Sequence, residues 1–176
     1  MPSGFSGFQN QVITTTIKHA LVHQGTIYYF TLNDLSLAAG GVLELLIRVG
    51  AERHMSLVGD FSGTLTFRGQ LFEEPTINVL GTEVFPVNRN RSHKNLPMGS
   101  TFFDGTTTYT ADGTEIDNLL AIGGKGSVGA ATVDLDWELE PSTDYLLRVT
   151  NEGNQVSPVQ VTLVMHDERA NVHRFR

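Results

Sequence analysis

Short segments in which apolar and polar residues alternate make up much of this chain, and turn-forming residues separate them. The clearest alternation covers residues 132–139, where Val133, Leu135, Trp137 and Leu139 occupy every second position between polar residues. A period of two is typical of a β-strand with one buried face. We therefore expect these four apolar side chains to point into a core.

Most other apolar segments are also short and rich in β-branched or aromatic residues, which favours strands. Residues 42–49 are the one segment with helical potential, because Glu44 and Arg48 have the i, i+4 spacing. Eight residues between Gly41 and Gly50 nevertheless favour a strand. The remaining predicted strands are 12–17, 26–32, 55–58, 64–68 (with Leu65 and Phe67 inward), 76–80, 101–103, 106–110, 145–149 and 159–165.

Turn signals between these strands include residues 33–34, 38–41, 59–60 and 69–70, and Asp104-Gly105 predicts a hairpin. Roughly nine or ten short strands without a convincing helix indicate a sandwich or barrel. We predict an all-β, antiparallel β-sandwich of jelly-roll or Greek-key type. Its expected domain is 25–166, after an extended N-terminal arm (1–24), exchanged between subunits or docked on a partner, and before a polar tail (167–176).

Composition excludes several classes of function. The 176 residues are enough for one buried domain, with 40% hydrophobic and 18% charged residues. The absence of cysteine rules out disulfides and thiolate chemistry. A net charge of −7 argues against direct nucleic-acid binding. No apolar segment is long enough to cross a membrane, and we expect no secretory signal because a basic region followed by an apolar core is missing.

The histidines do not form a predicted metal site. His19 and His23 have helical spacing in a strand-like context, where they would be about 13 Å apart. The other four are isolated: His54, His93, His166 and His173. We therefore expect neither a metal nor a cofactor.

Two further motifs also have plain structural interpretations. The sequence at 123–127 resembles a phosphate loop, but Gly126 follows Lys125 and a strand is predicted next, so we interpret it as a bend. Acidic residues alternate along the 132–140 segment as Asp134, Asp136, Glu138 and Glu140. A solvated outer face explains them, with calcium binding, acid–base chemistry or a basic partner as alternatives. No nucleophile elbow or metalloprotease helix is present, and we predict that the protein is not an enzyme.

A basic cluster stands out in this acidic chain: Arg89, Arg91, His93 and Lys94. They lie in a predicted loop at 88–99, and no acidic residue occurs between Glu83 and Asp104. A solvated turn is one interpretation. The alternative is a docking loop for acidic groups on a partner protein, where charge sets orientation and association rate. A polynucleotide is the weaker variant, because no aromatic residues are interleaved with the charges.

Four segments carry a resemblance to a known family. They are Tyr28 to Thr31 (YYFT), Leu45 to Gly50 (LLIRVG), Pro86 to Arg91 (PVNRNR) and Pro141 to Asn151 (PSTDYLLRVTN). Together they resemble the small decoration (cement) proteins of tailed-bacteriophage heads, over roughly residues 26–166.

The resemblance implies a β-sandwich on the outer surface of an expanded phage head, made in the bacterial host cytoplasm. Its partners would be the major capsid protein and itself, as a homodimer or homotrimer, with no membrane and no direct nucleic acid. Arg89 and Arg91 match the arginine-bearing loop of the family, whereas Arg148 is expected to be structural. The family offers no catalytic residue to carry over.

Two other classes of function remain open from the sequence. One is a tail or baseplate accessory protein, or a glycan- or receptor-binding module, although the single tryptophan, Trp137, is expected to face inward. The other is an enzyme whose groups converge only in the tertiary structure.

Overall fold

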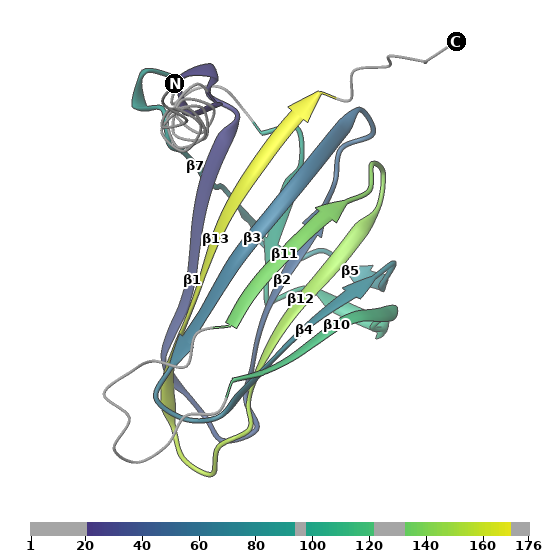
Figure 1. The fold of residues 1–176 in the computed structure, drawn as a ribbon. Coiled ribbons are helices and arrows are strands. Elements are labelled where there is room, and N and C mark those ends of the chain that lie inside the picture. The colour runs from purple at the N-terminus through teal and green to yellow at the C-terminus, as the bar shows by residue number, and fades with distance from the viewer. Residues whose placement is uncertain (1–20, 94–97, 122–132, 170–176) are drawn as a thin grey trace, which may run out of the picture.

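Two antiparallel β-sheets packed face to face make up the computed structural model, which describes residues 21–93, 98–121 and 133–169 (Figure 1). The first sheet has the order β11-β3-β13-β1-β7, and the second has the order β10-β4-β12-β2-β8-β6. A small ribbon pairs β5 with β9. The predicted antiparallel β-sandwich is thus confirmed, whereas its jelly-roll or Greek-key wiring stays a prediction.

The elements follow one another along the chain with these bounds: β1 (Ile27–Leu37), β2 (Val42–Arg48), β3 (Arg53–Gly63), β4 (Phe67–Glu73), β5 (Thr76–Val79), β6 (Glu83–Val84), β7 (Val87–Asn88), the 3-10 helix η1 (Arg91–His93), β8 (Thr101–Asp104), β9 (Thr108–Ala111), β10 (Thr114–Ala121), β11 (Val133–Leu139), β12 (Asp144–Asn151) and β13 (Ser157–Arg169). A helical turn at 21–24 precedes β1. No helix in the described parts of the chain is long and apolar enough to span a membrane.

The first sheet shows the alternation that the sequence predicts. In β13 the apolar side chains Val159, Val161, Leu163 and Met165 are at most 2% exposed. In β11 the side chain of Leu139 is buried and Trp137 packs against the core, as predicted. The side chains of Val133 and Leu135 lie outside the described residues. Alternation is clear in this sheet because only one of its faces is covered.

The second sheet is buried on both faces near its centre. Leu45, Leu46 and Ile47 of β2 are consecutive and all fully buried, so the predicted strand at 42–49 is confirmed without alternation. Leu46 is fully buried but is not part of the core between the two sheets, so it is covered on the outer face of this sheet. Burial, together with the nearby charge of Glu44 in β2, raises the pKa of Tyr109 in β9 to about 12. A continuous apolar run is what a strand with two covered faces requires.

Three predicted turns are wrong, because residues 33–34, 59–60 and 69–70 lie inside β1, β3 and β4. Each is aligned with neighbouring strands: β1 with β13, β3 with β13 and β11, and β4 with β12 and β10. Ladder hydrogen bonds therefore outweigh the local turn preference. At Gly69 packing also explains why glycine lies within a strand. A Cβ there would lie 3.2 Å from the ring of Phe61 on the facing sheet.

The hairpin predicted at 104–105 is also wrong. The chain does turn there, where the Thr107 amide donates to the Asp104 carbonyl. However, β8 pairs with β2 and β6, whereas β9 pairs with β5. The strand expected at 64–68 begins only at Phe67, although Phe67 is buried and Leu65 packs against the core as expected.

The C-terminal boundary differs from the expectation as well. β13 continues to Arg169, and Asp167 is almost fully buried rather than part of a polar tail. Pairing of Asp167 with Met55 in β3 keeps these residues in the sheet. The predicted strand at 12–17 and most of the predicted arm lie outside the described residues.

Candidate docking surface

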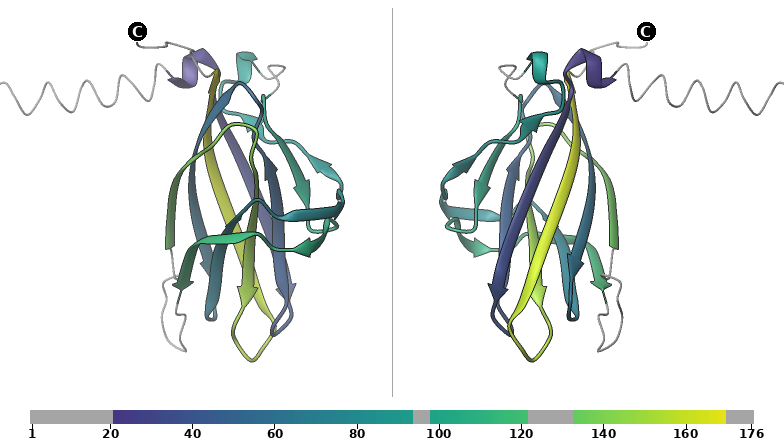
Figure 2. Two further views of the ribbon diagram at one scale, coloured as in Figure 1. Left: turned by 90° about the vertical axis from the view of Figure 1, so that its right-hand side faces the viewer. Right: turned by 90° about the vertical axis from the view of Figure 1, so that its left-hand side faces the viewer.

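The basic residues singled out in the sequence lie where β7 leaves the first sheet, near the end of the molecule that carries η1 (Figure 2). Arg89 directly follows β7, Arg91 begins η1, and both side chains are exposed. His93 ends η1, but its side chain and all of Lys94 lie outside the described residues. The structure therefore places two of the four predicted residues on one exposed turn. Pro86 and the exposed Phe85, which is 74% accessible, immediately precede β7.

Two asparagines hold the start of this turn. Asn88 is buried, and its Nδ2 donates to the Gly25 carbonyl at 2.7 Å while its Oδ1 accepts from the Asn90 amide at 2.8 Å. Asn90 repeats the arrangement, donating to the His23 carbonyl and accepting from the Ser92 amide. The Arg89 amide donates to the Ile27 carbonyl of β1. Asparagine side chains that cap successive backbone amides fix the turn locally.

A buried carboxylate holds the far end of the same loop. Oδ2 of Asp167 accepts a hydrogen bond from the Gly99 amide at 2.7 Å, and a nitrogen of Arg53 lies 3.8 Å from it. Oδ1 has no hydrogen-bond partner among the described residues. Burial raises the pKa of Asp167, although the Gly99 amide, Arg53 and His166 oppose this shift. The loop that begins with Arg89 is thus anchored at both ends.

The remaining arginines with described side chains are all engaged in ion pairs. Arg48 pairs with Asp144, Arg53 with Asp167, Arg68 with Glu152, and Arg148 with Glu44 and Asp112. Within the described residues, Arg89 and Arg91 are the arginines that have no acidic partner. We call Phe85, Arg89 and Arg91 the docking surface.

The anchors of the docking surface were not identified from the sequence. Asn88 and Asn90 stand in the quoted PVNRNR segment, and their spacing is a local signal for capped turns. Asp167 is 68 residues from Gly99 in sequence, so no local pattern connects them. Arg148 behaves as expected: it is a structural residue held by two carboxylates.

We expect replacement of Asp167 by asparagine to change how stability depends on pH. The raised pKa means that the folded state binds this proton more tightly than the unfolded chain does. Its contribution is therefore complete below the ordinary aspartate pKa and is lost as pH rises through the raised value. Urea unfolding between about pH 4 and pH 8 should show wild type losing stability relative to Asp167→Asn as pH rises.

The matched control for this measurement is Glu52→Gln, which alters an exposed carboxyl in the turn between β2 and β3. It should follow the wild-type profile. A constant difference between wild type and Asp167→Asn at every pH would show that burial of this carboxyl has no energetic consequence.

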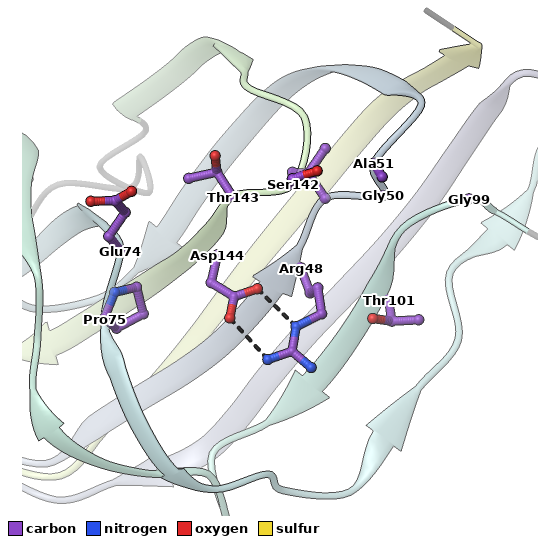
Figure 3. Close-up of a pocket in the computed structure, with 11 residues that line it drawn as sticks. Arg48, Gly50, Ala51, Glu74, Pro75, Gly99, Thr101, Ser142, Thr143 and Asp144 are labelled. Atoms are coloured by element: carbon purple, nitrogen blue, oxygen red, sulfur yellow. Dashed lines mark hydrogen bonds and ion pairs between the residues drawn. The ribbon is translucent and has the colours of Figure 1, made fainter.

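A separate cleft of about 580 Å³ lies at one end of the second sheet and is lined by both polar and apolar groups (Figure 3). In it, Nε and Nη2 of Arg48 donate to the two carboxylate oxygens of Asp144 at 2.8 and 2.9 Å. Glu74 and Ser142, both in the lining, have positive φ angles of 55° and 60°. Because the guanidinium is already paired with a carboxylate, the cleft offers no free charge from this arginine to bind a ligand.

The other candidate residues do not converge. Across residues 21–93, 98–121 and 133–169 there is no group of three or more His, Cys, Asp or Glu side chains that could hold a metal. Asp136 and Glu138 are exposed on the outer face of β11, and Glu140 is exposed just beyond it. His54 is exposed on β3. Asp134, His19, His173 and the 123–127 segment have side chains outside the described residues.

Neither a family model nor a curated protein matches this chain. Among solved structures, a chain from the crystal structure of the T13 IBDV viral particle is similar with a TM-score of 0.28 and 13% identity. The alignment covers 82% of this chain and 36% of the viral one, so the chain spans about a third of that protein's length. A TM-score this low supports no statement about fold or function.

Proposed function

We propose that this protein is a non-enzymatic structural component of a phage particle, which binds the outside of the expanded head and cements neighbouring capsomers. The observation that carries the proposal is the state of Arg89 and Arg91. They are exposed and anchored, and they lack an acidic partner among the described residues of a chain with net charge −7. The resemblance to head decoration proteins points to the major capsid protein as the partner.

An exposed pair of arginines on a hydrogen-bonded turn suits recognition of carboxylates on a protein surface. The hydrogen bonds of Asn88 and Asn90 order the backbone there before binding, and the planar guanidinium pairs with carboxylates in a fixed geometry. Phe85, which is exposed just before β7, offers an apolar side chain on the same segment. A protein that binds only the assembled shell stabilises it by mass action, and many copies multiply the effect.

We predict that the double variant Arg89→Ala, Arg91→Ala binds shells about tenfold or more weakly at low salt, and with a smaller salt dependence. Binding is measured by co-sedimentation of purified protein with expanded, emptied heads stripped of the native copy. Melting temperature should stay unchanged, because neither side chain pairs with another described group.

The control is Arg68→Ala, which removes an exposed arginine from the other sheet. It should bind shells like wild type. Equal binding of the double variant and wild type at low salt would rule out the docking surface.

Electron cryomicroscopy of the same reconstituted heads tests the function as a whole. We expect regular density on the outer shell, in contact with the turn that carries Arg89 and Arg91. Bare heads, with density at the tail or nowhere, would overturn the decoration role.

A further inference from the structure

One row of side chains crosses the whole outer face of the first sheet, one residue from each strand. The strand register aligns Val87 in β7, Tyr29 in β1, Val164 in β13, Val58 in β3 and Asp136 in β11. Val87, Tyr29 and Val58 are 51%, 38% and 44% exposed, and Val164 is partly exposed between them. We call these five residues the outer row.

The opposite face confirms that the outer row points away from the core. The neighbouring residues along the same strands form the inward row: Asn88, Tyr28, Met165, Leu57 and Trp137. The first four are at most 5% exposed, and Trp137 packs against the core. Because side chains alternate along a strand, the outer row is an apolar band on a solvent-facing surface.

Charge is distributed unequally between the two ends of this band. Arg89 continues the strand past Val87, and its amide bonds to Ile27 of β1, so it lies at the β7 edge. At the opposite edge β11 presents Asp136, and Glu138 lies in the next row on the same face. None of the three has an ion pair with another described residue. The face is therefore basic at the β7 edge and acidic at the β11 edge. Between these edges the outer row is apolar, whereas the rows that flank it are mostly polar, with Thr31, Thr162 and Asp60 on one side and Ile27, His166 and Ser56 on the other.

Such a face is complementary to itself. β13 is the central strand of the sheet, so a two-fold axis along it exchanges the β7 and β11 edges. Two copies stacked face to face about this axis keep each row opposite its equivalent, which brings Val164 against the partner copy's equivalent and Tyr29 against Val58. Arg89 lies level with Ile27, in the row that ends at Glu138 on β11, so it faces Glu138 of the other copy. A two-fold axis across the strands would instead place like charges together, so the charges select one orientation.

We propose that two copies of this chain form a dimer through the outer face of the first sheet, related by a two-fold axis along β13. The band is about 19 Å wide and β1 is about 35 Å long, taking 4.8 Å between strands and 3.3 Å per residue. These dimensions give at most about 670 Å² per copy, because β7 and β11 are shorter than β1, and this is toward the small end of the area that each partner buries in a stable interface. In this dimer Arg89 contacts the second copy, so Arg91 and Phe85 are the residues of the docking surface that remain for a shell.

The dimer is tested by sedimentation equilibrium of the full chain over a range of concentrations, without shells. Wild type is expected to dimerise, and Val58→Glu should raise the dimer dissociation constant about tenfold or more, because it places a carboxylate in the apolar band opposite Tyr29. Leu120→Glu is the control: Leu120 is 48% exposed in β10 of the other sheet and should leave dimerisation unchanged.

A charge exchange tests the orientation independently of folding. Arg89→Glu and Glu138→Lys should each weaken the dimer, because each creates a like-charge pair across the interface. The two changes together should restore it, since the introduced carboxylate of one copy would then face the introduced ammonium group of the other. A double variant no better than the single variants would overturn the orientation.

A monomeric wild type, a trimer, or equal effects of Val58→Glu and Leu120→Glu would overturn the dimer. Because shells are absent, these outcomes leave the proposed head binding unaffected. Conversely, failure of wild type to bind heads would overturn the proposed function without affecting the dimer.

Discussion

Replacement of Arg148 by alanine is expected to lower the free energy of unfolding by about 3 kcal/mol, because it leaves a buried carboxylate without its partner. Nε of Arg148 donates to Glu44 at 2.6 Å, and its two terminal nitrogens donate to the two oxygens of Asp112 at 2.7 Å. The side chains of Arg148 and Glu44 are only 19% and 12% exposed. Arg148 also lies over the ring of Phe72, 5.2 Å from its centroid.

This network connects three parts of the second sheet region. Arg148 and Glu44 are aligned on β12 and β2, and Asp112 comes from the segment between β9 and β10. Arg148 lowers the pKa of Asp112, so the stabilisation is present above the ordinary aspartate pKa and is lost as pH falls through the lowered value.

Urea unfolding of Arg148→Ala at neutral pH measures the effect. Arg68→Ala is the matched control, because the Arg68–Glu152 pair is exposed on both sides and should be worth under about 1 kcal/mol. If the two variants lose the same amount, the network around Arg148 is no stronger than an ordinary surface ion pair.

Substitution of Gly113 by alanine should also lower the free energy of unfolding by about 3 kcal/mol, because it combines left-handed backbone strain with a steric clash. Gly113 has a φ of +93°, and an added Cβ would collide with the carbonyl oxygen of Glu73 and meet the backbone of Glu74 and Pro75 at 2.9 Å. These are backbone atoms, which cannot rotate away as a side chain can. Displacing this turn would also move the adjacent Asp112 from Arg148.

Gly40→Ala separates the effect of backbone strain from the effect of a steric clash. Gly40 has a φ of +70°, but nothing lies within 4 Å of an added Cβ, so its variant should lose only about 1 kcal/mol from backbone strain. Thermal or urea unfolding of both variants gives the comparison. Equal losses would show that the turn at Gly113 yields to the methyl group without cost.

The local pattern of apolar and polar residues was sufficient to predict a strand where one face of the strand is covered or where the strand is apolar throughout. The alternation in β11 and β13 and the run at 42–49 predicted strands correctly. The inward positions are confirmed for the apolar residues of β13 and, in β11, for Trp137 and Leu139. Local pattern failed at residues 33–34, 59–60 and 69–70, where glycine and short polar residues suggested turns. Long β1, β3 and β4 continue through them because hydrogen-bonded neighbours support the extended backbone there.

The candidate site was also predicted in part from the sequence, and the rest of it depends on the fold. Arg89 and Arg91 are visible as a local excess of charge, and the loop around them could be placed from its lack of apolar periodicity. Their lack of acidic partners, in contrast to the other described arginines, depends on which residues the fold brings to each guanidinium. The anchor between Asp167 and Gly99 likewise joins residues far apart in the chain.

The outer row shows most clearly which information is local in the sequence and which depends on the fold. Alternation along each strand specifies which side chains share a face, and that information is local. Which strands are neighbours, and which residue of one lies opposite which residue of the next, follows from non-local pairing. Only that pairing aligns Val87, Tyr29, Val164, Val58 and Asp136, because five segments between residues 27 and 169 must come into register before the band and its charged edges exist.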